Sequence, residues 1–252
     1  MNRLSLLSAL LVGALLTAGC SVKPPARIGT YLGPSVESMQ STQADLRALG
    51  DGQLQAGLLL INDTSLPDSA PALSEHGLAF LSDAVRRRIE GNTPIRIAKV
   101  LPSSGLTPDT AHQAVSRLGR EQGVPYVLMV IFSSMESEIP LMLPLGGDPE
   151  QGGGRPGVSG FEANNYALAE LALLETSSGR VVARSDGRAW SRLNRLYVPV
   201  QSNAYPVIHR SLRVAPIYPR EEDAKDVLRS IAGDEALEQA VYQLELAWAK
   251  PA

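Results

Sequence analysis

The side chains that could do chemistry are few, and their spacing supports no familiar reactive site. The 252-residue chain has three histidines, His76, His112 and His209, and one cysteine, Cys20. Neither a His-x-x-x-His spacing nor a pair of cysteines is present to supply the ligands of a zinc ion. A Ser-His-Asp triad could be assembled from distant residues, but no Gly-x-Ser-x-Gly turn indicates one. The sequence therefore predicts no catalytic residues, no metal and no cofactor.

Two other polar features could bind small ions. Asp63 and Asp68 follow a strand-like run and could hold a cation, although loop aspartates more often form turns and helix caps. The glycine-rich stretch 146–157 has no Gly-Lys-Ser/Thr ending, so it predicts a flexible loop rather than a phosphate site. The net charge of -3 and the pI of about 5.7 give no reason to expect a nucleic-acid partner.

Cys20 stands at the end of a three-part secretory signal. Met1-Asn2-Arg3 gives a positive start, residues 4–16 are almost wholly apolar, and the small residues 17–19 precede the cysteine. The apolar run is shorter than the roughly 20 residues of a membrane-spanning helix. The pattern predicts that residues 1–19 are removed as a signal peptide. An ordinary signal peptide with a coincidental cysteine is the alternative.

The sequence Leu16-Thr17-Ala18-Gly19-Cys20 resembles the lipobox of bacterial lipoproteins. The resemblance implies transfer of diacylglycerol to the Cys20 thiol, cleavage before Cys20 and acylation of the new amino terminus. Several acyl chains make such anchoring stable. Ser21, where an aspartate would imply retention in the inner membrane, favours the outer membrane and a periplasm-facing protein. Lys23, two residues later, weakens this prediction, so the inner membrane remains the alternative location.

Residues 20–53 are expected to form a lipid-anchored tether with a short helical segment. Residues 21–34 contain three prolines and two glycines, which predicts an extended, unpacked tether. Residues 35–49 have weak helical character. The tether is short, so the folded domain should sit close to its membrane.

Residues 54–252 are predicted to form a single α/β domain. The pattern predicts a buried strand at Leu58-Leu59-Leu60-Ile61, an amphipathic helix at residues 74–89 and a second strand at residues 95–100. Residues 107–123 read as another helix and 126–132 as a central strand. This order predicts parallel strand pairs joined by right-handed crossovers.

The second half of the domain shows a different pattern. Residues 166–174 and 180–190 alternate as two antiparallel strands around a Ser178-Gly179 turn. Residues 197–219 are expected to be extended, and Leu237 to Trp248 carry the apolar stripe of a closing helix. The predicted fold class is α/β, a mixed sheet with two crossover helices, a β-hairpin and a C-terminal helix.

These elements resemble a known group of periplasmic lipoproteins. After the lipobox come Leu58-Leu59-Leu60-Ile61, the amphipathic helix, the run 123–130 and the hairpin around 175–182. This order is similar to lipoproteins built on the fold of the TolB amino-terminal domain, among them activators of penicillin-binding proteins and accessory domains of secretion lipoproteins. Rhombosortase-target lipoproteins share it, although residues 241–252 lack their Gly-Gly tail. The resemblance covers residues 54–190 and implies a non-catalytic, protein-binding role.

One connection is long enough to need its own explanation. Residues 133–164 are predicted to form a loop, and loops beyond about 12–15 residues are uncommon unless they are functional or disordered. The loop begins with an apolar stretch whose prolines do not suit a central strand. The predicted contact residues for a protein partner or a membrane are Leu141, Met142, Leu143 and Leu145. The alternative is that the loop folds back over one face of the sheet.

Two classes of function remain open. The first is a lipid-anchored accessory module that binds an envelope protein in envelope assembly, cell-wall synthesis or export. The second is a periplasmic small-molecule binder or hydrolase whose site is built from scattered residues. The absence of a catalytic motif favours the first class, and the sequence does not name the partner.

Overall fold

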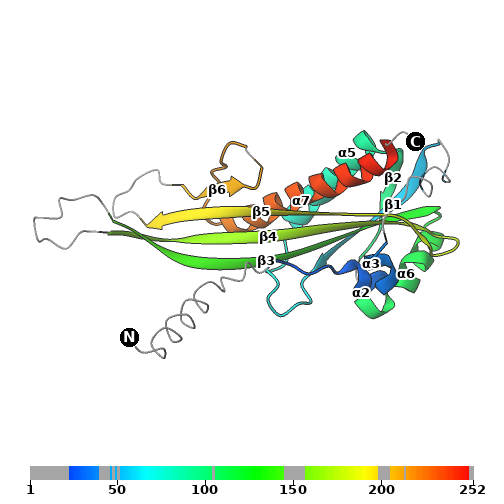
Figure 1. Cartoon of the computed structure of the whole chain (residues 1–252), viewed down its shortest axis with the longest axis horizontal. Coiled ribbons are helices and arrows are strands. Elements are labelled where there is room, and N and C mark those ends of the chain that lie inside the picture. The colour runs from blue at the N-terminus through cyan, green and yellow to red at the C-terminus, as the bar shows by residue number, and fades with distance from the viewer. Residues whose placement is uncertain are drawn as a thin grey trace, which may run out of the picture.

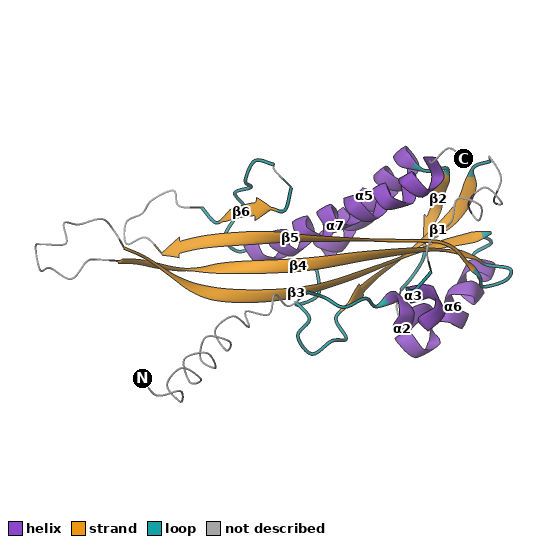
Figure 2. Ribbon diagram, viewed as in Figure 1, coloured by secondary structure: helices purple, strands orange, loops and turns teal. Residues whose placement is uncertain are grey.

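The strands of the protein form one mixed sheet that is covered by helices on both faces (Figures 1 and 2). The computed structural model describes residues 23–39, 46, 49, 52–103, 106–144, 157–197, 205–212 and 214–249. The strand order is β2-β1-β3-β4-β5-β6. The strands are β1 (Leu54–Asp63), β2 (Ile95–Val100), β3 (Tyr126–Pro144), β4 (Gly157–Glu175), β5 (Val181–Tyr197) and β6 (Val207–Arg210). The helices are α2 (Ile28–Leu32), α3 (Pro34–Glu37), α5 (Glu75–Asn92), α6 (Pro108–Glu121) and α7 (Ala224–Ala249).

The topology confirms the predicted fold class. Strand β1 pairs in parallel with both β2 and β3, and α5 and α6 make the two crossovers. Strands β3 to β6 pair antiparallel. The turn between β4 and β5 contains Gly179 with a φ of 73°, a conformation that favours glycine. Helix α7 is the predicted closing helix, but it is 26 residues long and begins well before the predicted stripe.

Helices on both sides explain why the central strands are apolar without interruption. Leu58 and Leu128 pack in a core with α5 and α7. Their neighbours Leu59 and Val127 pack in a second core with α2 and α6. Because successive side chains of a strand point to opposite faces, a strand buried on both faces must be apolar at every position.

The predicted loop over residues 133–164 is wrong, because most of it continues the sheet. Strands β3 and β4 stay paired from Tyr126–Glu175 out to Pro144–Gly157. Strand β1 stops pairing with β3 at Ser133, so the outer part of β3 lies at an edge. Pro140 is tolerated there because an edge strand has no neighbour that needs its missing N–H group. Residues 145–156 lie outside the described residues.

The expectation of an unpacked tether over residues 21–34 is wrong from Ile28 onward. Ile28, Tyr31 and Leu32 form helix α2 and are buried against the core that also contains α6. The proline and glycine content of this segment led to the wrong prediction, because it does not reflect the apolar surface that these three large side chains bury. Cys20 and the predicted signal peptide lie outside the described residues. None of the described helices combines the length and the apolar character needed to cross a membrane.

Candidate interaction surface

Three strands extend beyond the helices α2, α3 and α6 as a long arm (Figure 1). We define the arm as residues 134–144, 157–167 and 189–197, which remain hydrogen-bonded to one another. The first half of α7 packs on one face of it, where Ala163 and Leu193 meet Leu228 in a small apolar core. The arm is therefore a supported part of the sheet rather than an isolated hairpin.

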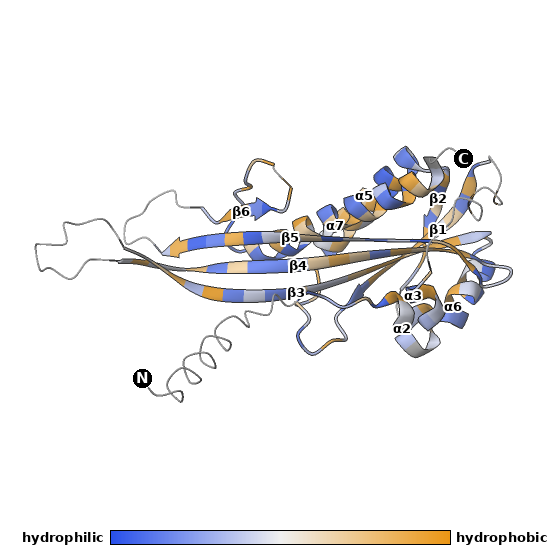
Figure 3. Ribbon diagram, in the orientation of Figure 1, coloured by the Kyte–Doolittle hydropathy of each residue, from blue (hydrophilic) through white to orange (hydrophobic). Residues whose placement is uncertain are grey.

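Large apolar side chains are exposed near the far end of the arm. The ribbon there alternates between hydrophobic and hydrophilic positions (Figure 3). The exposed fractions are 72% for Met142, 53% for Tyr197 and 51% for Ile139. We define the arm-end surface as Ile139, Leu141, Met142, Phe161 and Tyr197. Exposed apolar side chains that gather in this way are typical of an interaction site.

The arm-end surface has two faces. Met142 and Tyr197 both pair with Ser159, so their side chains lie in one row. The ring of Phe161 lies 6.2 Å from the ring of Tyr197. Ile139 and Leu141 point to the opposite face, and Leu141 is partly buried. Of the predicted contact residues, the structure describes the side chains of Leu141 and Met142, and it places them on opposite faces of β3. The side chain of Leu143 and all of Leu145 lie outside what is described.

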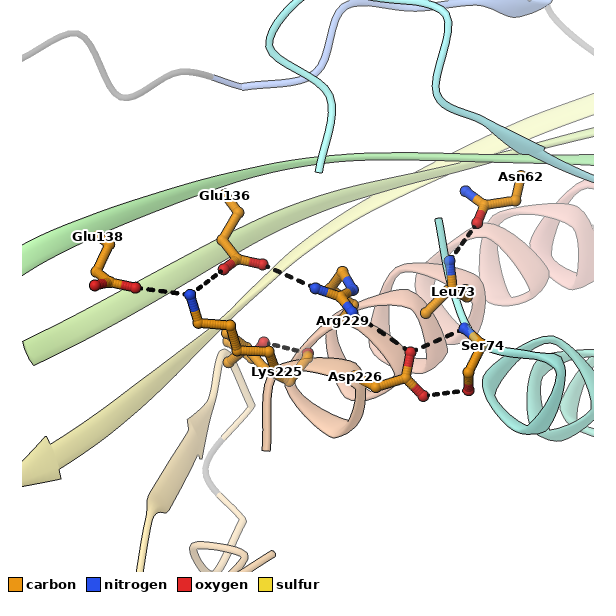
Figure 4. Close-up of polar contacts among 10 residues, drawn as sticks. Asn62, Leu73, Ser74, Glu136, Glu138, Lys225, Asp226 and Arg229 are labelled. Atoms are coloured by element: carbon orange, nitrogen blue, oxygen red, sulfur yellow. Dashed lines mark hydrogen bonds and ion pairs between the residues drawn. The ribbon is translucent and has the colours of Figure 1, made fainter. Parts of the chain in front are cut away.

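Ion pairs fix the start of α7 to the outer part of β3 (Figure 4). The Lys225 ammonium lies 2.7 Å from a Glu138 carboxylate oxygen and 3.5 Å from one of Glu136. The hydrogen bond to Glu138 raises the pKa of Lys225, so this side chain stays charged at neutral pH. Arg229 reaches Glu136 at 3.3 Å. These contacts hold α7 against the arm.

A second set of contacts joins α7 to α5 (Figure 4). The Ser74 hydroxyl donates to Asp226 at 2.5 Å, and the same oxygen accepts from the Gly77 N–H group at the start of α5. Burial acts to raise the pKa of Asp226, but hydrogen bonds from Ser74 and the charge of Arg229 outweigh it and hold the pKa below its usual value. Both helices and the arm are therefore held in one arrangement.

On the opposite face, the N-terminal segment is fixed to the sheet by a clamp made of Arg27, Asp63 and Glu170. The Arg27 guanidinium lies 2.6 Å from Asp63. The backbone N–H groups of Arg27 and Ile28 donate to one oxygen of Glu170, at 2.7 and 3.1 Å. Burial raises the pKa of Glu170. At Asp63 burial acts in the same direction, but hydrogen bonds from Ser65 and Arg27 prevail and lower the pKa.

This clamp gives Asp63 a structural role. Its carboxylate is occupied by Arg27 and by the Ser65 N–H group, whereas Asp68 is exposed. Among the described residues, no group of three or more His, Cys, Asp or Glu side chains could hold a metal ion. Sequence reasoning missed the clamp because Arg27 and Glu170 are 143 positions apart, and no local pattern links them.

The three histidines are not brought together. His76 lies on α5, His112 on α6 and His209 on β6. His112 is 3.2 Å from the Gly179 carbonyl oxygen, in an open groove of about 840 Å³ between α6 and the β4–β5 turn. Ser116 and Ser178 also line this groove, and the Ser178 hydroxyl donates to the Glu175 carboxylate at 2.6 Å. A catalytic triad would join the serine to the histidine and the histidine to the acid, whereas here the serine binds the acid directly and His112 contacts a backbone carbonyl oxygen.

Comparison with known proteins gives only distant structural similarities. No family model matches the sequence, and no curated protein matches it. The PelC dodecamer from Paraburkholderia phytofirmans aligns with 77% of this chain and 88% of its own, at 14% identity and a TM-score of 0.32. A putative neuraminyllactose-binding hemagglutinin homolog from Helicobacter pylori aligns with 79% and 87%, at 9% identity and a TM-score of 0.34. The LpoB C-terminal domain from Salmonella enterica aligns with 59% of this chain and 94% of its own, at 14% identity and a TM-score of 0.28. Similarities at this level identify neither a function nor a partner for this chain.

Proposed function

We propose that the protein is a lipid-anchored envelope lipoprotein that acts as a non-catalytic accessory module and binds a protein partner through its arm-end surface. The observation that carries the proposal is the placement of exposed apolar side chains on an arm that α7 supports. The lipobox-like sequence before Cys20 supports the anchoring, and Ser21 favours the periplasmic side of the outer membrane.

The arm-end surface suits a protein partner for two physical reasons. Met142 is unbranched and adapts to an irregular partner surface, and Tyr197 combines a large apolar ring with a hydroxyl group. Aromatic residues and methionine are enriched at the centres of protein interfaces. The pairing of β3, β4 and β5 fixes the backbone of this surface, so binding orders few additional residues and costs little entropy.

Photocrosslinking in cells tests the proposed contact. A photoreactive amino acid at Met142 should form a discrete adduct with one envelope protein. The matched control places the photoreactive amino acid at Tyr242, an exposed residue in the second half of α7, whereas the first half of this helix packs on the arm. We expect no such adduct from the control. Equal labelling from both positions, or no discrete adduct at Met142, would contradict the proposal.

The alternative function, a small-molecule binder or hydrolase, has one observation in its favour, the groove beside His112. The groove is open and is lined mostly by polar residues, whereas small-molecule sites usually enclose most of their ligand among apolar side chains. The arm-end surface is therefore the better-supported site.

A further inference from the structure

The place where the chain enters the folded domain is fixed on one face of the sheet. Lys23 and Pro24 lie beside Tyr166, Arg188 and Trp190, around a small cavity of about 160 Å³. The Arg188 guanidinium donates to the Pro24 carbonyl oxygen at 2.7 Å. From there the segment runs along the sheet toward α2, on the side away from α7 (Figure 1).

Strand alternation shows that these side chains face away from α7. Ala167 and Ala189 pair with each other and belong to the core that contains α5 and α7. Tyr166 and Trp190 also pair with each other, one position along each strand, so they point to the other face. We define the anchor-side face as Lys23, Tyr166, Arg188, Trp190 and Arg192.

The length of chain before Lys23 limits how far this face can be from the lipid. Three Cα–Cα steps of about 3.8 Å separate Cys20 from Lys23, a span of at most about 11 Å. The clamp at Arg27 prevents the next residues from lengthening this span, because it ties them to the buried carboxyl groups of Asp63 and Glu170. A lipid on Cys20 therefore brings the anchor-side face, and not the α7 face, to the membrane surface.

The chemistry of this face matches a layer of phospholipid headgroups. Trp190 is 37% exposed, and tryptophan and tyrosine are enriched where a membrane meets water. Lys23 and Arg188 are exposed and form no ion pair within the described chain, so both can reach phosphate groups. Arg192 lies 5.6 Å from the Trp190 ring and also pairs with Glu162 at 3.2 Å. The local excess of positive charge contrasts with the net charge of -3 for the whole chain.

We propose that the anchor-side face lies against the phospholipid headgroups of the membrane that holds the lipid on Cys20. This proposal rests on the lipidation included in the proposed function. The arm then lies along the membrane surface, and α7 faces away from it. The row of Met142 and Tyr197, on the α7 side of the sheet, is left accessible to a protein.

Fluorescence quenching by lipids tests this orientation in the full lipidated chain. The protein has two tryptophans, Trp190 and Trp248. The variant Trp248→Phe leaves Trp190 as the only tryptophan, and Trp190→Phe leaves Trp248 as the matched control. Each is reconstituted in vesicles of phosphatidylethanolamine and phosphatidylglycerol, with or without bromine atoms on the acyl chains. We expect bromination to lower the Trp190 emission about twofold, because a headgroup-level indole lies close to the bromines, and to leave Trp248 nearly unchanged.

The outcomes separate this proposal from the proposed function. Mass spectrometry showing that Cys20 carries no diacylglycerol would overturn both proposals. A lipidated chain that floats with the vesicles but shows no quenching of Trp190 would overturn the orientation alone and leave this face to a protein or a second copy. Equal quenching of both tryptophans would also overturn it, because the chain would then have no preferred face. If Trp248→Phe unfolds α7, Trp248→Tyr provides a second variant in which Trp190 is the only tryptophan.

Discussion

Gly187→Ala is expected to lower the free energy of unfolding by about 2 to 3 kcal/mol. A Cβ atom at Gly187 would lie 2.1 Å from the Ala236 carbonyl oxygen and 2.5 Å from the Ala240 backbone nitrogen, both in α7. A helix backbone cannot move aside as a flexible side chain can. The methyl group would push α7 away from β5, where the helix makes its most extensive contact with the sheet.

The matched control is the same substitution at Gly91, near the end of α5. A Cβ atom there meets nothing within 4 Å. Alanine is favoured over glycine in a helix, so Gly91→Ala should raise stability by up to about 1 kcal/mol. Chemical denaturation of the two variants checks the opposite signs. A Gly187→Ala variant as stable as the wild type would contradict the close packing of α7.

Arg27→Ala is expected to lower the free energy of unfolding by about 3 kcal/mol at neutral pH, because it leaves the buried carboxylate of Asp63 without its positively charged partner. The exposed fractions of the two side chains are only 13% for Arg27 and 2% for Asp63. As a control, Arg117→Ala removes an ion pair whose side chains, Arg117 and Glu121, are 71% and 61% exposed. Such surface pairs contribute about 0 to 1 kcal/mol.

The loss caused by Arg27→Ala should depend on pH. Because folding lowers the pKa of Asp63, the stability from this carboxylate is present above its unfolded pKa of about 3.9 and is lost as the pH falls through the lower folded-state value. The difference between wild type and variant should therefore be largest near neutral pH and shrink in acid. Denaturation midpoints measured across the acidic range check this. A difference that stays constant with pH would show that the Asp63 charge does not hold the segment.

Several helices and strands of the fold could be predicted from the sequence because each carries a strong local pattern. The apolar run at 58–61 and the helical spacing after Ser74 each identify an element without knowledge of its neighbours. The Ser178-Gly179 turn predicts the hairpin in the same way, since the positive φ of Gly179 favours glycine. The prediction of two crossover helices follows from the order of these elements.

The arm and the clamp could not be predicted because their cause is not local. Pro140 indicates a loop when the strand is assumed to be central, and only the end of β1 pairing at Ser133 makes the outer part of β3 an edge. Tyr197 and Phe161 come together with Met142 through strand register, which the sequence does not reveal. The burial of Tyr31, whose pKa rises to about 12 through burial and the nearby Asp63, likewise depends on distant residues.

The clamp and the arm together determine how the arm-end surface would be held relative to the membrane. The clamp fixes the chain within a few residues of Cys20 to one face of the sheet, whereas α7 supports the other face. A short tether and a supported arm would hold the arm-end surface at a defined distance from the membrane. A partner in the same envelope layer would then meet that surface in a restricted orientation, which favours association.

The most direct test of this account is to measure partner binding and stability together in one arm-end variant. The variant combines Met142→Ser and Tyr197→Ser, and the matched control combines Val100→Ser and Tyr242→Ser, which are exposed apolar residues away from the arm. We expect both to retain the wild-type free energy of unfolding within about 1 kcal/mol. The arm-end variant alone should bind the partner captured at Met142 at least about tenfold more weakly. Unchanged binding, or a loss of stability that shows these side chains to be core residues, would contradict the account.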